Sequence, residues 1–164
     1  MKQLVILGSG GYGHTVADVA EQLGYNILFL DDSLPGYELS TFSSYIDDHT
    51  EFIPAFGNNE FRLSWCNRIT QSGAELATLI HPTAYVSPKA SIAPGTVILT
   101  HAIVNTDSVI NRGSIVNLGS IVDHGCIIEE GVHVCLGAIV KGENRIQRLS
   151  KIEAGEVVER GQRK

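Results

Sequence analysis

A branched aliphatic residue recurs at every sixth position through the second half of the chain. The run is unbroken over fourteen positions, each of them isoleucine or valine: Ile80, Val86, Ile92, Ile98, Val104, Ile110, Val116, Val122, Ile128, Val134, Val140, Ile146, Ile152 and Val158. A helix repeats every ~3.6 residues and a simple strand every two. A period of six therefore predicts short strands that turn a corner every six residues, with one aliphatic side chain from each strand pointing inward. Three strands complete one coil, and the coils stack.

The first 77 residues follow a different pattern, in which apolar stretches of strand length alternate with amphipathic stretches of helix length. Residues 32–51 are polar and predict a loop. The chain is therefore expected to contain a Rossmann-like βαβ domain over residues 1–77 and a β-helical domain over residues 78–164. Strands are predicted over residues 4–7, 26–30, 52–56 and 76–80, and helices over the stretches that carry Val16, Val19, Ala20 and Leu23, and Phe61, Trp65 and Ile69.

A glycine-rich turn follows the first predicted strand. It reads Gly8-Ser9-Gly10-Gly11-Tyr12-Gly13 and matches the GxGxxG pattern, with a helix after it and the acidic pair Asp31-Asp32 about 20 residues further on. Such a turn lets backbone N–H groups approach a phosphate at a helix N-terminus. The alternative is a tight turn without a ligand. Because the unit is only about half of a dinucleotide fold, a mononucleotide-linked substrate is expected rather than NAD.

Charge and cysteine content exclude several function classes. The chain has 12 Lys and Arg against 18 Asp and Glu, a net charge of −6, and no cationic cluster, which argues against a nucleic-acid or anionic-membrane partner. Its apolar runs have strand length, so no membrane span is expected. The three cysteines form no CxxC pair, and a reduced cytoplasmic protein is expected.

The two halves together resemble the sugar-nucleotide N-acetyltransferases that act on UDP-4-amino sugars of the bacillosamine type, which are grouped with sialic-acid O-acetyltransferases and perosamine N-acetyltransferases. The resemblance implies a left-handed β-helix of hexapeptide repeats, a homotrimer, and acetyl-CoA bound in a groove between neighbouring subunits. It is carried, in this order along the chain, by GSGGYGHTVADVAEQLGY, FLDD, AFGNNEFR, LIHPTAYVSPKASI, VNLGSIVDHGCIIEEGVHVCLGAIV and KGENRI.

The resemblance also implies roles for individual residues. His124 matches the catalytic base, Asn117 an active-site asparagine, His133 a histidine beside the acetyl-CoA thioester, and Gly142 a glycine along the pantetheine path. A histidine suits the chemistry, because a protonated sugar amine must lose a proton before it attacks a thioester. The nucleotide sugar is expected to contact Gly10, Gly11, Tyr12, Gly13, Asp31, Asp32, Gly57, Asn58 and Asn59.

One position departs from the family pattern. The residue after the catalytic histidine is usually acidic, and here it is Gly125. Two carboxylates are candidates to replace it: Asp123, adjacent in sequence, and Asp107, eighteen residues earlier and therefore one full coil away. We expect Asp107 to stack over position 125 and to replace the acid. The alternative is that Asp107 is a solvated turn residue.

The function expected from this resemblance is acetyl-CoA-dependent N-acetylation of a nucleotide-linked 4-amino-4,6-dideoxy sugar, most readily UDP-linked. The alternatives are O-acetylation of a sialic-acid-like sugar, or a trimeric nucleotide-sugar binder without catalysis. The second alternative arises because family members usually have more coils and a C-terminal tail over the CoA groove, whereas this repeat ends at Val158. No metal is expected, because His124 and His133 are nine residues apart and do not match the spacing of β-helical zinc enzymes.

Overall fold

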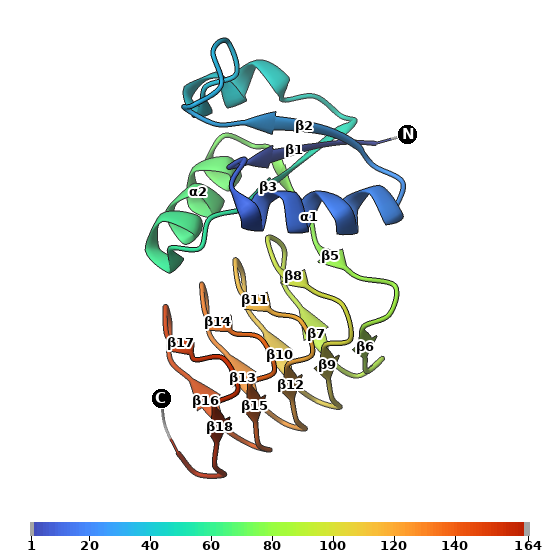
Figure 1. Ribbon diagram of the computed structural model, residues 1–164, viewed down its shortest axis with the longest axis vertical. Coiled ribbons are helices and arrows are strands. Elements are labelled where there is room, and N and C mark those ends of the chain that lie inside the picture. The colour runs from blue at the N-terminus through green and yellow to red at the C-terminus, as the bar shows by residue number, and fades with distance from the viewer. Residues whose placement is uncertain (1, 163–164) are drawn as a thin grey trace.

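The computed structural model describes residues 2–162 and places a small α/β unit against one side of a β-helix (Figure 1). The α/β unit has a parallel four-stranded sheet in the order β2-β1-β3-β4. Its elements are β1 (Gln3–Leu7), α1 (Gly11–Gln22), β2 (Asn26–Leu30), the 3₁₀ helix η1 (Leu39–Tyr45), β3 (Thr50–Pro54), α2 (Asn59–Gln71) and β4 (Glu75–Leu76).

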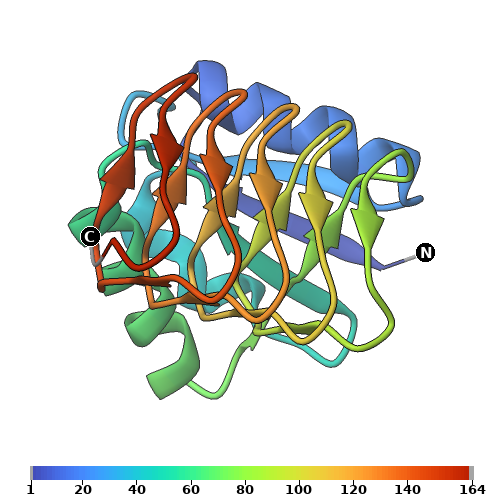
Figure 2. The same ribbon diagram turned by 90° about the horizontal axis from the view of Figure 1, so that it is seen from below.

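Alternation along β1 explains how both faces of this sheet are covered. Leu4 and Ile6 pack in a cluster with α1, whereas Val5 and Leu7 pack with η1 and α2. Central strands of parallel sheets are buried on both faces in this way. The cluster on the α1 side also contains Val97, so α1 joins the sheet to the β-helix. Figure 2 shows α1 running roughly along the direction in which the coils stack.

The β-helix consists of two-residue strands arranged as three parallel faces. Strands that pair are eighteen residues apart, as in Ile121↔Ile139. Face 1 contains β5 (Leu79–Ile80), β8 (Val97–Ile98), β11 (Ile115–Val116), β14 (His133–Val134) and β17 (Lys151–Ile152). Face 2 contains β6 (Tyr85–Val86), β9 (Ile103–Val104), β12 (Ile121–Val122), β15 (Ile139–Val140) and β18 (Val157–Val158). Face 3 contains β7 (Ser91–Ile92), β10 (Val109–Ile110), β13 (Ile127–Ile128) and β16 (Arg145–Ile146).

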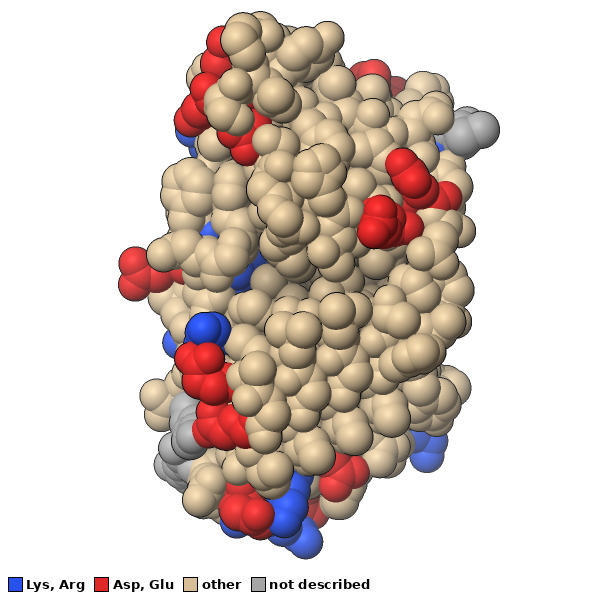
Figure 3. All heavy atoms as spheres, in the orientation of Figure 1, with Lys and Arg blue, Asp and Glu red and all other residues tan. Residues whose placement is uncertain are grey.

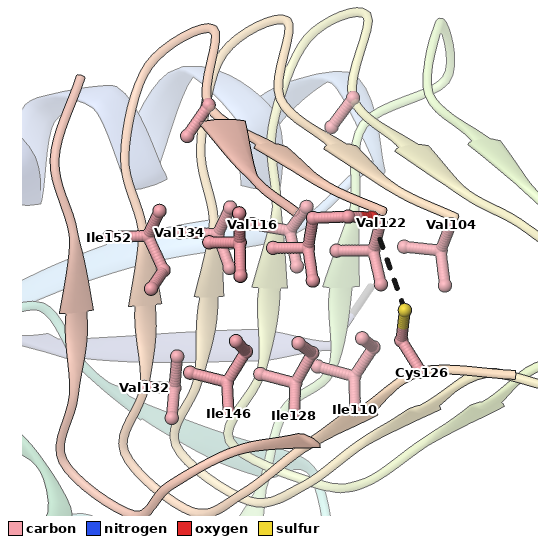
Figure 4. Packing of buried hydrophobic residues seen from close by; sticks show 14 of the residues in the cluster. Val104, Ile110, Val116, Val122, Cys126, Ile128, Val132, Val134, Ile146 and Ile152 are labelled. Atoms are coloured by element: carbon pink, nitrogen blue, oxygen red, sulfur yellow. Dashed lines mark hydrogen bonds between the residues drawn. The ribbon is translucent and has the colours of Figure 1, made fainter. Parts of the chain in front are cut away.

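The six-residue repeat forms the interior of this β-helix, as the sequence pattern predicts. Each repeat aliphatic is the second residue of its strand, and those from Ile98 onward are fully buried in one cluster. Equivalent side chains from successive coils stack in rows, for example Ile110, Ile128 and Ile146 (Figure 4). This stacking fixes the height of every corner residue, because each corner follows its strand directly.

Two predictions about the first half need correction. The strand expected over residues 76–80 is two strands, because β4 pairs with β3 whereas β5 pairs with β8 of the β-helix. The polar stretch 32–51 contains η1, whose Leu39 and Phe42 are buried. Two apolar residues three positions apart were too weak a signal in a polar stretch to predict a helical turn.

Arg62 fastens the two halves together. It is only 1 % exposed, and its guanidinium donates to the carbonyls of Gly113 (2.8 Å) and Gly131 (2.9 Å) at β-helix corners. It also donates to the Phe56 carbonyl (2.9 Å) and to Asn59 Oδ1 (2.8 Å). Within residues 2–162 no carboxylate pairs with Arg62, so neutral oxygens from three separate segments satisfy its charge.

Replacing Arg62 with leucine is expected to lower the free energy of unfolding by ~3–5 kcal/mol, because four buried acceptors lose their donor. Urea unfolding followed by circular dichroism measures this. Arg68→Leu is the control: Arg68 is exposed and lies over the Phe42 and Trp65 rings, and its loss should cost at most ~1 kcal/mol. Equal stability of the two variants would contradict a fastening role for Arg62.

Candidate active site

His124 lies at the corner that follows β12, beside an ionised carboxylate. Its Nδ1 is 3.1 Å from Asp123 Oδ1. The same oxygen accepts hydrogen bonds from Asn105 Nδ2 (3.0 Å) and from the His124 backbone N–H (2.7 Å). The donors, Asn105 first, lower the pKa of Asp123 to about 2 against the opposing effect of burial. Asp123 is therefore a carboxylate at neutral pH, and His124 Nε2 has no hydrogen-bond partner within residues 2–162.

The imidazole of His124 rests on Gly142, one coil further along. A Cβ atom built on Gly142 would lie 2.5 Å from Cε1, 2.8 Å from Nε2 and 2.9 Å from Nδ1 of the ring. Any side chain at position 142 would collide with the imidazole in this orientation. The glycine is required for space and not for a left-handed backbone.

Asn117 and His133 form a second polar pair, in which the hydrogen bonds determine the histidine tautomer. Asn117 Oδ1 accepts from the Leu118 N–H (2.8 Å), so its Nδ2 faces His133 Nε2 at 2.9 Å and must donate. His133 Nε2 is then the acceptor and Nδ1 carries the proton. Burial, assisted by the charges of Arg62 and Lys151, lowers the pKa of His133 to about 4, so the ring is neutral at physiological pH.

The remaining N–H of His133 is a buried donor. Its Nδ1 is inaccessible to solvent and has no hydrogen-bond partner among residues 2–162. A buried unpaired N–H is costly in a folded protein and usually marks a place where a ligand supplies the acceptor. The pair therefore presents one fixed donor suited to a carbonyl oxygen or an oxyanion.

Within one chain, His124 is remote from this pair. Asn117 lies at the corner between faces 1 and 2 and His133 in β14 of face 1, whereas His124 lies at the corner between faces 2 and 3. One side of the prism separates them, on the order of 15 Å at ~3.3 Å per extended residue. The sequence predicts these three residues as one site, and a single subunit does not bring them together.

A cavity of about 440 Å³ lies at the carboxyl ends of β1, β2 and β3, where parallel α/β sheets bind ligands. Its shape comes from the glycine turn after β1 on one side and the turn before α2 on the other. It is lined by Gly8, Gly10, Gly11, Tyr12, Asp31, Ala55, Phe56, Gly57, Asn58 and Phe61. Of the residues expected to bind the nucleotide sugar, Gly10, Gly11, Tyr12, Asp31, Gly57 and Asn58 thus surround one space.

Comparison with known proteins places these features in a family. Residues 3–69 match the PglD N-terminal domain family. The acetyltransferase domain of PglB from Neisseria gonorrhoeae is 34 % identical, with 96 % of this chain and 82 % of that chain covered at a TM-score of 0.90. The chain therefore belongs to the sugar N-acetyltransferase family. It is an acyltransferase built on a left-handed β-helix of hexapeptide repeats.

Two further structures extend the likeness along almost the whole chain. The same PglB domain in complex with acetyl coenzyme A is 29 % identical, with 99 % of this chain and 95 % of that chain covered and a TM-score of 0.81. PerB from Caulobacter crescentus, in complex with CoA and GDP-perosamine, shares the fold at 23 % identity, with 99 % and 91 % coverage and a TM-score of 0.84.

Several residues of this acetyltransferase differ from their expected contacts in the glycine-turn cavity. Asp32 accepts from the Leu39 N–H (3.0 Å), and it does not line the cavity. Asn59 donates to the carbonyls of Leu149 (2.9 Å) and Ser150 (3.1 Å) on the β-helix. These side chains hold the fold, and neither is free to bind a ligand.

Two other residues serve the framework of the cavity. Asn58 caps α2 by accepting from the Phe61 N–H (2.8 Å), which leaves its amide nitrogen as the group available to a ligand. A Cβ atom on Gly13 would lie 2.1 Å from the Gly8 carbonyl oxygen, so this glycine lets α1 pack against the turn. Gly13 is therefore a packing residue.

Asp31 ties the glycine turn to the end of β2. Its carboxylate accepts from the backbone N–H of Ser9 (2.7 Å) and from both the backbone N–H and the hydroxyl of Ser33 (2.9 and 2.7 Å). These bonds, the one from Ser9 first, hold the pKa of Asp31 far below its ordinary value. Its charge is therefore present at the cavity at neutral pH.

Sequence reasoning missed the aromatic side of this cavity. Phe56 and Phe61 meet edge to face with ring centroids 4.6 Å apart, and Phe61 is 44 % exposed. The sequence suggests Phe61 as a core residue of a helix, because its spacing from Trp65 is helical. An apolar residue in the first turn of a helix that follows a glycine is a weak signal for such a ledge.

The hypothesis that Asp107 replaces the missing acid is wrong. Asp107 is an exposed turn residue with a φ of 59°, and no hydrogen bond joins it to His124 within the part of the chain described. The coil spacing that motivated the hypothesis is correct, but the His124 ring leans onto Gly142 in the following coil, away from Asp107 in the preceding one. Asp123 is the carboxylate that contacts the ring.

Gly142→Ala is expected to lower kcat by ~10–100-fold, because the new methyl group displaces the imidazole by more than 1 Å and breaks its contact with Asp123. Backbone geometry at position 142 allows alanine, so the melting temperature should change little. Acetyl transfer measured by CoA thiol release tests this. Lys141→Ala, which removes the neighbouring exposed ion pair with Glu159, is the control and should retain wild-type kcat. Wild-type kcat in Gly142→Ala would show that the ring position is not critical.

The outward surface of face 2 is apolar along its whole length. The first residue of each strand points outward there, and none of the five is charged: Tyr85, Ile103, Ile121, Ile139 and Val157. Leu118 and Leu136 are exposed at the adjacent corner. A contiguous apolar stripe of this kind marks a protein–protein interface. In the view of Figure 3, acidic and basic side chains are interspersed, and most of those on the β-helical half lie towards its edges.

Among residues 2–162, no group of three or more histidine, cysteine or acidic side chains is arranged to hold a metal ion. The helices in the same range are too short or too polar to cross a membrane.

Proposed function

We propose that this acetyltransferase transfers the acetyl group of acetyl-CoA to the amine of a nucleotide-linked 4-amino-4,6-dideoxy sugar, in sites shared between the subunits of a homotrimer. The observation that carries the proposal is His124, whose Nδ1 faces the ionised Asp123 and whose Nε2 is free to accept a proton. The relatives support the substrates, since one was solved with acetyl coenzyme A and another with CoA and GDP-perosamine. UDP is the expected nucleotide from the sequence resemblance.

In the proposed reaction, His124 Nε2 removes a proton from the sugar ammonium group, and the free amine attacks the thioester carbonyl carbon. A C–N bond forms, and the carbonyl oxygen becomes an oxyanion that the Nδ1–H of His133 stabilises. Collapse of the intermediate breaks the C–S bond. The imidazolium of His124 then returns its proton to the CoA thiolate, so no covalent enzyme intermediate is needed. The buried thiols of Cys126 and Cys135, whose pKa values burial raises, are consistent with this direct transfer.

The trimer follows from two observations that point the same way. Face 2 is an apolar stripe, and its two edges carry the two halves of the chemistry: His124 on one, Asn117 and His133 on the other. Around a threefold axis, face 2 of each subunit turns inward and one edge meets the opposite edge of its neighbour. Three identical sites then form, each with His124 from one subunit and His133 from the next.

The nucleotide part of the substrate is assigned to the cavity at the glycine turn. Backbone N–H groups of Gly10 and Gly11 stand at the N-terminus of α1, where an anionic phosphate is favoured. Phe61 offers an apolar surface for the base or sugar at the same cavity. Since backbone groups and a phenyl ring do not distinguish one base from another, the experiment must test several nucleotides.

Mass spectrometry of acceptor sugars incubated with acetyl-CoA tests the function. UDP-, GDP- and dTDP-linked 4-amino-4,6-dideoxy sugars are compared with the matching 4-hydroxy sugars. One added acetyl group on an amino sugar alone is the expected result. Acetylation of the hydroxy sugar instead would indicate an O-acetyltransferase. Acetyl-CoA binding or nucleotide-sugar binding by calorimetry without any transfer would indicate a non-catalytic binder.

A further inference from the structure

We propose that Asn105 is a positioning residue for His124: it holds Asp123 in place and, through Asp123, keeps the proton on Nδ1 of the ring. The inference rests on the proposed function for its kinetic consequence, but the tautomer can be measured on the protein alone. Nothing in the sequence pattern assigns Asn105 a role, although it stands one coil before Asp123.

The orientation of the Asn105 amide is fixed by its own corner. Its Oδ1 accepts from the Thr106 N–H (2.8 Å), so the amide nitrogen must point to the other side and donate to Asp123 Oδ1 at 3.0 Å. The backbone supports the same alignment, because the Asn105 N–H donates to the Val122 carbonyl (2.9 Å) across the β-helix ladder. The ladder thus brings the amide to the carboxylate at a set height.

Asp123 is held from its backbone as well as from its side chain. The Ser108 hydroxyl donates to the Asp123 carbonyl (2.6 Å), and Asn105 Nδ2 and the His124 N–H both donate to its Oδ1. A carboxylate that is fixed and ionised accepts a proton from the ring nitrogen that faces it. His124 Nδ1 therefore carries the proton, and Nε2 keeps the lone pair that a general base requires.

The charged surroundings of His124 leave this role to Asp123. Glu143, the other carboxylate on the side towards which the ring leans, is ion-paired with Arg160. Lys141, at the same corner, is paired with Glu159. Asp123 is the carboxylate in contact with the ring, and Asn105 is its only side-chain amide donor among the residues described.

Equivalent corners offer a matched control. Asn111 occupies the same position after its strand as Asn105, but on the next corner of the prism, and it donates to the Ile128 carbonyl (2.9 Å). An asparagine at this position can therefore serve the fold alone. Comparing the two asparagines separates loss of a corner hydrogen bond from loss of the contact with Asp123.

The experiment uses Asn105→Leu, which keeps the approximate volume and removes the donor, beside Asn111→Leu. Two-bond ¹H–¹⁵N correlation spectra of histidine-labelled protein report which ring nitrogen is protonated, and His124 is assigned by its loss in His124→Gln. We expect the Nδ1–H form of His124 in the wild type and in Asn111→Leu, and a mixture containing Nε2–H in Asn105→Leu. Asn105→Leu should also lower kcat by ~10–100-fold with little change in KM.

An unchanged His124 tautomer in folded Asn105→Leu would overturn the proposal, whether or not kcat falls, because a fall alone would then reflect structure. Should Asn105→Leu fail to fold, Asn105→Ser, which retains a donor but shortens the side chain, is measured instead and the same criterion applies. If the wild-type protein acetylates none of the acceptors, the proposed function fails, and the spectra still decide whether Asn105 sets the tautomer.

Discussion

Glutamine in place of His124 is expected to lower kcat by ~10²–10⁴-fold without unfolding the protein, because the side chain can no longer accept the proton of the attacking amine. His124 is half exposed and lies outside the β-helical core, so the melting temperature should stay close to that of the wild type. The measurement is steady-state acetyl transfer under saturating acetyl-CoA. A kcat within threefold of the wild type would remove His124 from the mechanism.

The same variant tests whether two subunits share each site. His133→Leu removes the buried N–H donor and should also be poorly active. When chains carrying His124→Gln and His133→Leu are co-expressed in equal amounts, each mixed trimer contains one junction that joins an intact His124 to an intact His133. Statistical assembly then predicts recovery of about a quarter of the wild-type activity. Recovery is expected only if the two residues act across a subunit boundary, and its absence would place the site within one chain.

Ile121→Lys is expected to dissociate the trimer and to abolish acetyl transfer together. Ile121 lies at the middle of the apolar stripe on face 2, and three lysines brought near one threefold axis would lose hydration and repel one another. Light scattering after size-exclusion chromatography should give the monomer mass of 17.7 kDa in place of three times that value. Loss of activity follows because His124 and His133 separate.

Leu23→Lys provides the control for this effect. Leu23 is also an exposed apolar residue, but it ends α1 in the other half of the molecule, where a cation at a helix C-terminus is favourable. This variant should remain trimeric and active. If Ile121→Lys stays trimeric, face 2 is not the interface, and the assignment of shared sites must be abandoned.

Much of the fold could be predicted because its signals are local. The six-residue period places all fourteen repeat aliphatics at the second position of a strand, and the glycine turn marks the junction of β1 and α1. The strand over residues 76–80 was predicted as continuous because its apolar character does not change where the chain passes from one sheet to another. Only the pairing partners, β3 for β4 and β8 for β5, separate the two strands.

The candidate site was predicted as a set of residues, but their contacts were not. Position along the repeat gives the height and corner of His124, yet it does not indicate that the ring leans onto Gly142 and away from Asp107. Likewise, the acidic pair and the two asparagines near the glycine turn suit a ligand, but Asp32 and Asn59 bond to the protein instead. Side-chain rotamers and amide orientations depend on neighbours that are distant in sequence.

The sequence by itself determined the architecture, the family and the chemical character of the site, because period, turn residues and histidine chemistry are properties of short segments. The tertiary structure decided which carboxylate serves His124, which proton His133 keeps, and that one chain cannot bring the two histidines together. Those outcomes follow from hydrogen bonds between coils eighteen residues apart and from the width of the prism, and no short segment carries either quantity.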